Sequence, residues 1–194
     1  MVAVHEWLSP TRTVGLISYT AALIACGIGW VSCLRNHIRG RLYLLMAATQ
    51  FLLLLDMAFD WRWKLHDFWG LTASELGVYG PRRLPQVFAL AILCAGLAVA
   101  SVSLIRRFRG RGGAAIAAVG TVLSVGLWFC EVISYHYLDA ILYRLVGKVM
   151  VVSLAWSNLA AAACLGIWFD VQRGSIHRSN LEDARSNSVR ARKE

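Results

Sequence analysis

A long apolar run meets a polar segment at residues 52–70, which read LLLLDMAFDWRWKLHDFWG. Four leucines lead directly into charged side chains, with tryptophans threaded between them. Such a pattern is typical of the end of a membrane-spanning helix, because a span needs about 20 predominantly apolar residues. Tryptophan is also enriched where a span leaves the hydrocarbon. The stretch therefore indicates a membrane protein, and it leaves open what Asp56, still inside the apolar run, contributes.

The composition supports a membrane protein. Of the 194 residues, 58% are hydrophobic and 16% are charged, whereas roughly 25% of the residues of a soluble domain are charged. Five apolar stretches have the length of a span, at residues 14–34, 42–59, 85–105, 113–135 and 145–169. The predicted fold is all-α, a small polytopic bundle of about five transmembrane helices. Residues 171–194 are polar and of mixed charge, so we expect a disordered cytoplasmic tail.

The net charge of +9 comes from basic residues that cluster beside the apolar stretches. Three basic segments fall on one side of a five-span protein, at residues 35–41, 106–111 and 173–193. The positive-inside rule makes that side cytoplasmic and places the amino terminus outside. The expected location is a cell membrane of bacterial inner-membrane type. The expected partners are the lipid bilayer and other membrane subunits. Nucleic acid is not expected, because nothing beyond the charge supports it.

Cysteine and amide side chains in the spans predict packing, not chemistry. Five cysteines are scattered through or beside the apolar stretches without a CxxC pair, so we interpret them as small core residues. Gln50 and Asn158 are lone amides within spans, and we expect them to form interhelical hydrogen bonds.

Two carboxylates within the spans are the main candidates for a functional site, because burying a charge in hydrocarbon is costly. Asp56 and Glu131 each lie a few residues inside the predicted outer end of a span. At 1.5 Å per residue, both fall on the order of 5 Å below the same interface. Two polar stripes would emerge there if the helices continue. The first is Asp56, Asp60, Trp63 and Asp67, and the second is Glu131, Tyr135, His136, Asp139 and Tyr143.

Several interpretations of these stripes remain open. In the first, the carboxylates pair with arginines and hold the outer loop in place. The available cations are Arg62, Arg82, Arg83, Arg144 and Lys148. The second is a divalent metal site. Its candidate ligands are Asp56, Asp60, His66, Glu131, His136 and Asp139.

Three further interpretations involve a cofactor, a reaction or an anion. Haem could be ligated by His66 and His136. Acid–base chemistry on a lipid would use Asp56, Glu131 or His136 as catalytic residues. An anionic headgroup could bind Arg82 and Arg83, which two prolines flank.

The predicted function is a non-enzymatic accessory, assembly or interaction component, because the spans leave little chain for an extramembrane domain. The alternative is a membrane-embedded metal- or haem-binding redox protein, or a lipid-modifying enzyme.

Overall fold

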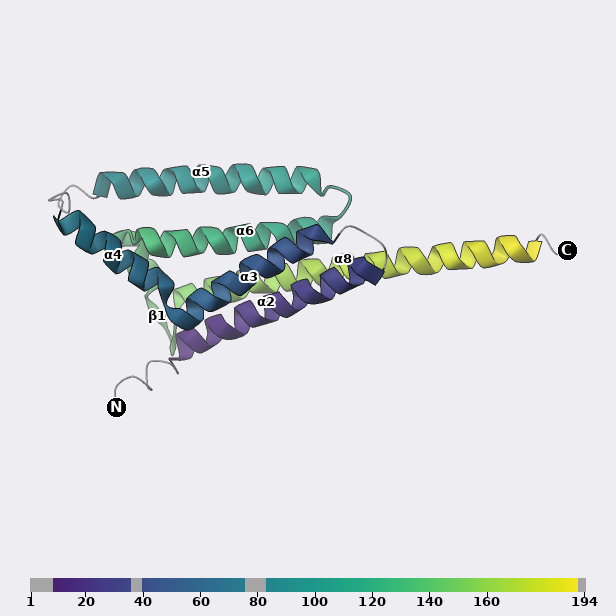
Figure 1. The fold of residues 1–194 in the computed structure, drawn as a ribbon, viewed down its shortest axis with the longest axis horizontal. Helices are drawn as coiled ribbons and strands as arrows, with labels where there is room; N and C mark the ends of the chain where they lie inside the picture. Colours follow the sequence, from purple (N-terminus) through teal and green to yellow (C-terminus); the bar gives the residue numbers. More distant parts are fainter. Residues whose placement is uncertain (1–8, 36–39, 76–82, 192–194) are drawn as a thin grey trace.

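The computed structural model describes residues 9–35, 40–75 and 83–191, and nearly all of them are helical (Figure 1). The elements are α2 (Pro10–Arg35), α3 (Arg41–Phe59), α4 (Trp61–Glu75), α5 (Arg83–Arg107), α6 (Gly112–Ile133), α7 (His136–Leu142), β1 (Leu145–Val146), β2 (Val149–Met150) and α8 (Val151–Ala191). The all-α membrane bundle predicted from the sequence is confirmed. Five helices are long and apolar enough to cross a membrane: α2, α3, α5, α6 and the Val151–Arg173 part of α8.

The last span begins later than predicted, at Val151 and not at residue 145. The six preceding residues form the short antiparallel pair β1–β2, in which Leu145 faces Met150. Gly147 turns this pair with a φ of 66°, which glycine adopts without steric cost. At its other end, α8 continues past the bundle to Ala191 (Figure 1). The disorder expected for this tail stays a prediction.

Four helices form the centre of the bundle, and a fifth, α5, stands apart. Helix α2 packs against α3 and α8, and α8 packs closely against α6. Gly166 permits that approach, since a Cβ atom there would lie 2.6 Å from the backbone nitrogen of Ala117. Helix α5 lies along α6, and none of its residues is buried in the described structure (Figure 1). The apolar length of α5 suits contact with a lipid bilayer.

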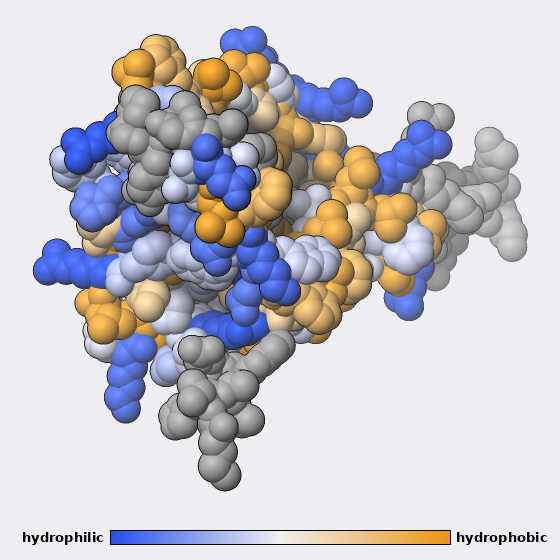
Figure 2. All heavy atoms as spheres, turned by 60° about the vertical axis from the view of Figure 1, so that its left-hand side comes forward, coloured by the Kyte–Doolittle hydropathy of each residue, from blue (hydrophilic) through white to orange (hydrophobic). Residues whose placement is uncertain are grey.

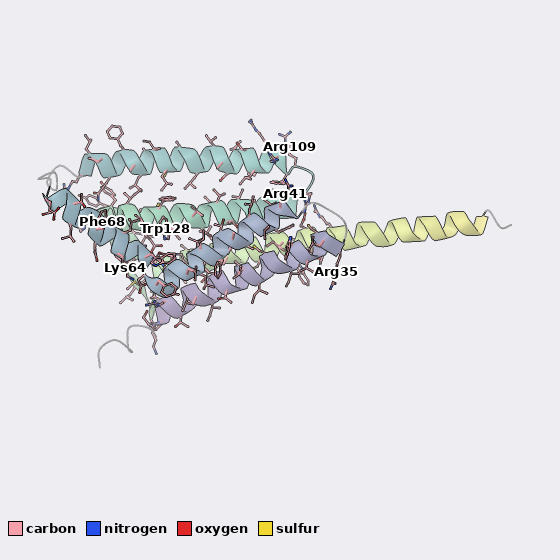
Figure 3. All side chains as sticks on the ribbon, viewed as in Figure 1. Arg35, Arg41, Lys64, Phe68, Arg109 and Trp128 are labelled. Atoms are coloured by element: carbon pink, nitrogen blue, oxygen red, sulfur yellow. The ribbon has the colours of Figure 1, made fainter. Side chains whose placement is uncertain are left out.

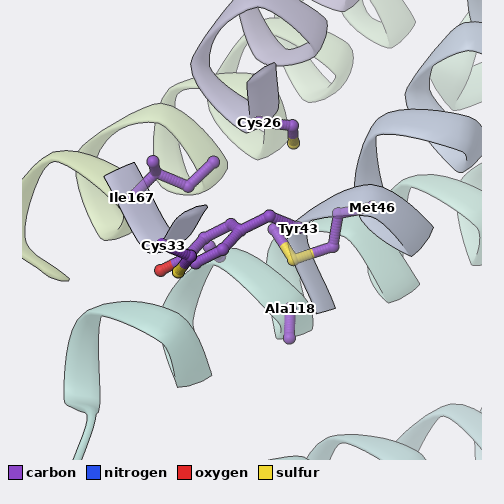
Figure 4. Packing of buried hydrophobic residues seen from close by; sticks show 7 residues of the cluster. Cys26, Cys33, Tyr43, Met46, Ala118 and Ile167 are labelled. Atoms are coloured by element: carbon purple, nitrogen blue, oxygen red, sulfur yellow. The ribbon is translucent and has the colours of Figure 1, made fainter. Parts of the chain in front are cut away.

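Two apolar clusters fill the bundle. Figure 4 shows the first, which consists of Cys26, Cys33, Tyr43, Met46, Ala117, Ala118 and Ile167. The second consists of Tyr19, Leu53, Met57, Leu142, Val152 and Trp156. Cys26 and Cys33 pack as small core residues, as expected from the sequence, and Cys130 and Cys164 are partly buried. Cys94 is exposed on α5, none of whose described residues is buried, so the expectation for Cys94 was wrong.

The two amides within the spans behave differently. Gln50 donates to the hydroxyl of Thr121 on another helix, at 3.3 Å, so the expected interhelical hydrogen bond is confirmed. Asn158 instead donates to the carbonyl of Leu154 in its own helix, at 2.8 Å, and the expectation for Asn158 was wrong. Its side chain is exposed, and a backbone carbonyl one turn earlier is within reach.

Two helix breaks decide how the polar residues are arranged. Asp60 separates α3 from α4 with a φ of 55°, and Ser134 separates α6 from α7 with a φ of 48°. Both residues adopt the left-handed conformation, which ends a helix because it reverses the local twist. The two continuous stripes predicted from the sequence are therefore wrong. Beyond each break, the directions of the side chains no longer follow the periodicity of the preceding helix.

Candidate functional site

One arginine joins the two carboxylates that the sequence singles out. The bundle end that contains the close of α3, the start of α4 and the close of α6 is called the Arg62 end here (Figure 1, left). Arg62 is only 4% exposed there, and Asp56 and Glu131 are each 3% exposed. These three residues, together with Trp156, are called the Arg62 cluster.

The break at Asp60 gives Arg62 its position. Because the chain turns at that residue, the backbone N–H of Arg62 faces back toward α3 and donates to Oδ1 of Asp56 at 2.8 Å. Arg62 is the second residue of α4, where backbone N–H groups lack partners within the helix. The Asp56 carboxylate thus caps α4 from the preceding helix. This arrangement fixes the direction in which α4 leaves the bundle.

The guanidinium of Arg62 then spans the two helices. Its Nε lies 2.9 Å from Oδ2 of Asp56, and its Nη1 lies 2.5 Å from Oε2 of Glu131. Its Nη2 lies 3.3 Å from the sulfur of Met57. One side chain from α4 therefore pairs with one carboxylate on α3 and with another on α6. The planar guanidinium, with five N–H donors, suits such a bridge better than the point charge of lysine.

Trp156 of α8 completes the cluster. Its indole N–H donates to Oε1 of Glu131 at 3.0 Å, so both oxygens of that carboxylate have a donor. The Cζ atom of Arg62 also lies 5.0 Å from the centre of the Trp156 ring, within the range of a cation–π contact. Helices α3, α4, α6 and α8 thus all meet at one guanidinium.

The electrostatics of the cluster keep the guanidinium charged. Burial lowers the pKa of Arg62, but the Glu131 and Asp56 carboxylates raise it by more, so its pKa lies above the usual value. A buried charge is tolerated only when it is paired and hydrogen-bonded. The cluster meets that requirement for all three of its charged residues.

A second ion pair lies beside the first. Nη1 of Arg12, on α2, lies 2.9 Å from Oδ2 of Asp60. Nη2 of Arg12 donates to the carbonyl of Ala58 at 2.6 Å. Asp60 is more open than the Arg62 cluster, since its side chain is 42% exposed. This pair connects the start of α2 to the turn at Asp60, which sets the direction of α4.

A pocket of about 340 Å³ opens beside both ion pairs. Its lining comes from α2, α3, α4, α6, β2 and α8 and from residues next to helix ends: Ser9, Thr11, Arg12, Met57, Asp60, Arg62, Trp63, Glu131, Tyr143, Met150, Val152 and Trp156. Burial and the nearby Glu131 carboxylate raise the pKa of Tyr143, so its phenol stays protonated at neutral pH. Figure 2 shows this end of the molecule, where hydrophilic side chains gather and apolar ones cover the flanks.

The remaining metal and haem candidates lie outside the Arg62 cluster. His66 packs edge-on against Trp63, and His136 is exposed beside Tyr137. Asp139 accepts a hydrogen bond from the hydroxyl of Ser134. Among the side chains that the structure describes, which lie within residues 9–35, 40–75 and 83–173, no three from His, Cys, Asp or Glu come together in a way that could hold a metal ion.

The anion candidates are divided between the described and undescribed parts of the chain. Arg83 begins α5 and is exposed, while Arg82 lies outside the described residues.

Sequence reasoning missed a second polar cluster at the opposite end of the bundle. Arg111 pairs with Asp170 through Nη2–Oδ2, at 2.5 Å, and Nε–Oδ1, at 3.3 Å. The Tyr43 hydroxyl donates to the same Oδ2 at 2.5 Å. We call Tyr43, Arg111 and Asp170 the Arg111 cluster. Asp170 is the residue that could have indicated this cluster. It is an acidic residue at the end of the last apolar stretch, whereas the other segments on the same side are basic.

Basic side chains surround the Arg111 cluster. Arg35, Arg41 and Arg109 gather at this end, whereas Lys64 and Phe68 lie on α4 at the other (Figure 3). The geometry thus has one end with buried ion pairs beside a pocket and one basic end. Comparison of the chain with models of protein families, with curated proteins and with solved structures finds no match in any of the three.

Proposed function

We propose that this chain is a non-enzymatic accessory, assembly or interaction component of a membrane, in which the Arg62 cluster fixes helix α4 on the bundle. The observation that supports this most strongly is the state of the two carboxylates within the spans. Asp56 and Glu131 both pair with Arg62, and Glu131 also accepts from Trp156. Carboxylates held in this way act as anchors, since Oδ1 of Asp56 and both oxygens of Glu131 have donors and Oδ2 of Asp56 is ion-paired with Arg62.

Helix α4 is the element that such an anchor would present. It leaves the bundle at a fixed angle and exposes large apolar side chains to its surroundings. Those side chains are Trp61, Trp63, Leu65, Phe68 and Leu71. A helix with apolar and charged residues at the end of a bundle suits the membrane interface, where it can contact a partner subunit.

We infer an orientation from the two ends. Figure 3 shows Arg35, Arg41 and Arg109 at the Arg111 end. Arg106 and Arg107 end α5 and Arg111 precedes α6, which brings the arginines there to six. The positive-inside rule favours that end for the cytoplasm and the Arg62 end for the outside of a cell membrane. Reporters fused after Arg173 and within residues 76–82 test this orientation. Activity of a cytoplasmic reporter at the second position would contradict it.

Site-specific cross-linking tests the interaction role. A photoreactive phenylalanine analogue at Phe68 should yield a defined protein adduct in the native membrane. The same analogue at Ile17, an exposed residue of α2, should give only lipid adducts. Lipid adducts alone at both positions would contradict the role of α4 as a docking element.

The alternative function is a metal- or haem-binding redox protein or a lipid-modifying enzyme. The pocket beside Glu131 favours it, because a buried carboxylate in a cavity is a common catalytic arrangement. Metal analysis and a visible absorption spectrum of the purified protein distinguish the two functions. Stoichiometric metal or a Soret band would overturn the non-enzymatic proposal.

A further inference from the structure

The pocket at the Arg62 end has polar and aromatic walls that suit one kind of ligand. Its volume of about 340 Å³ lies at the small end of the range for small-molecule sites. The floor is formed by Arg62 and Glu131, which are buried, whereas Asp60 at the side keeps 42% of its side chain exposed. A ligand that enters the pocket can therefore reach the Asp60 carboxylate.

The charges in and beneath the pocket favour a cation. Three carboxylates, Asp56, Asp60 and Glu131, face two guanidiniums, Arg12 and Arg62, which leaves a net charge of 2 − 3 = −1. Both guanidiniums have protein acceptors: Arg12 contacts Asp60 and the Ala58 carbonyl, and Arg62 contacts the other two carboxylates. An anion would meet the surplus carboxylate, whereas a cation would balance it.

The aromatic walls favour an organic cation over a metal ion. The rings of Trp63 and Tyr143 lie 5.6 Å apart at an angle of 39°, and both line the pocket. The electron-rich faces of such rings attract ammonium groups, and quaternary ammonium ligands are recognised in this way. Met57 and Met150 add polarizable apolar surface for the alkyl part of the ligand. Metal coordination would instead require several oxygen or nitrogen ligands around one point.

We infer that this pocket binds an organic ammonium group, with Asp60 as counter-ion and with the Trp63 and Tyr143 rings as its aromatic wall. A free amine or quaternary ammonium solute and a lipid headgroup both carry this chemistry. The inference goes beyond the proposed interaction role, since it depends on the pocket and not on the outer face of α4.

Binding of choline to the purified full-length chain tests the inference. Calorimetry in detergent should show saturable binding of choline. It should also show binding at least tenfold weaker for 3,3-dimethylbutanol, which has the same shape without the charge. Equal binding of the neutral analogue, or no saturable binding of choline, would overturn the inference.

Variants connect the signal to the pocket. Asp60→Asn removes the charge and keeps a residue type that tolerates the left-handed conformation. It should weaken choline binding roughly tenfold. Trp63→Leu, at an exposed position, should weaken it severalfold, and it provides the test if Asp60→Asn fails to fold. Asp67→Asn removes the same charge from an exposed part of α4 outside the pocket lining and should leave binding unchanged. Wild-type affinity in both pocket variants would overturn the assignment.

Nanodiscs separate the two sources of the ammonium group. If a lipid supplies it, phosphatidylcholine discs should raise the apparent Kd for free choline severalfold relative to phosphatidylglycerol discs. If a solute supplies it, the two Kd values should agree. Loss of choline binding in both kinds of disc would contradict the inference. Cross-linking from Phe68 is independent of this result, so the two proposals can fail separately.

Discussion

The two ends of the bundle use the same chemistry in different surroundings. At the Arg62 end, one guanidinium with a side chain 5% exposed bridges two carboxylates that are themselves buried. At the Arg111 end, the Arg111 side chain is 37% exposed and pairs with one carboxylate, Asp170. Both arginines also lie near an aromatic ring, Trp156 at 5.0 Å and Tyr43 at 5.9 Å.

Because the two ends differ in burial, we expect these similar contacts to differ in how much they stabilise the bundle. Water can solvate Arg111 when its partner is removed, because more than a third of the side chain is open. Asp56 and Glu131 are each only 3% exposed, so water would solvate them far less than it solvates Arg111. The Arg62 cluster should therefore be sensitive to the loss of any one member, whereas the Arg111 cluster should tolerate the loss of Asp170 or of the Tyr43 hydroxyl, because water can solvate Arg111.

The largest effect is expected for Arg62→Gln. The substitution leaves two buried carboxylates without a counter-charge, which should lower the free energy of unfolding by about 3 to 5 kcal/mol. The measurement is unfolding in mixed micelles with increasing SDS, followed by circular dichroism. Arg144→Gln, a change of the same type at an exposed site, is the control.

A charge-neutral triple variant shows whether the stranded charges cause the loss. Asp56→Asn and Glu131→Gln, combined with Arg62→Gln, should recover a large part of the lost stability, since no uncompensated charge remains. A triple variant no more stable than Arg62→Gln alone would show that packing, and not charge, makes Arg62 important.

The next effect is expected for Trp156→Phe. The substitution removes the donor to Oε1 of Glu131 and part of a buried ring, and it should cost about 2 to 3 kcal/mol. Trp168→Phe on the same helix, where the side chain is exposed, is the matched control. Thermal midpoints in detergent that fall equally for both variants would argue against a special role for the indole N–H.

Hydropathy was sufficient to predict the five spans, because the thickness of the bilayer fixes their length. All five appear in the structure. It also placed Asp56 and Glu131 at a similar depth, and Arg62 pairs with both. The pairing itself could not be predicted. On a continuous helix, Asp56 and Arg62 would lie about 120° apart.

The single left-handed residue Asp60 brings Asp56 and Arg62 together. Such a break leaves little trace in the sequence, because aspartate is common in helices and loops alike. Ser134 has the same effect on the second stripe: it moves His136 and Asp139 onto a separate short helix.

Trp156 and the Arg111 cluster were missed for another reason. Tyr43 lies near a span end, where the membrane interface already explains an aromatic residue. Trp156 lies within the predicted last span, and periodicity gave no reason to single it out. Their roles arise from contacts between helices far apart in the chain. Such contacts depend on helix rotation and neighbour order, which hydropathy does not determine.

A smaller effect is expected for Asp170→Asn at the Arg111 end. Hydrogen bonding to Asp170 is the main reason that the pKa of Arg111 lies above its ordinary value. Asparagine keeps an acceptor for Arg111 and Tyr43, and water reaches Arg111, so the cost should be about 1 kcal/mol. The cost should shrink further between 0.05 and 1 M NaCl, whereas that of Arg62→Gln should not change. A salt-independent loss would show that Asp170 is as well shielded as Glu131.

The smallest effect is expected for Tyr43→Phe, which removes only the hydroxyl that donates to Asp170. The ring stays in the apolar core, and Asp170 keeps both contacts with Arg111, so the loss should be about 0.5 to 1 kcal/mol. Tyr137→Phe, at an exposed position on α7, is the control and should change nothing.

A double-mutant cycle of Tyr43→Phe with Asp170→Asn gives the coupling energy directly. If the two costs add without coupling, the hydroxyl contributes through the core and not through Asp170. The same cycle with Trp156→Phe and Glu131→Gln gives the coupling energy at the Arg62 end. Equal coupling energies at the two ends would mean that burial does not determine how much each cluster stabilises the bundle.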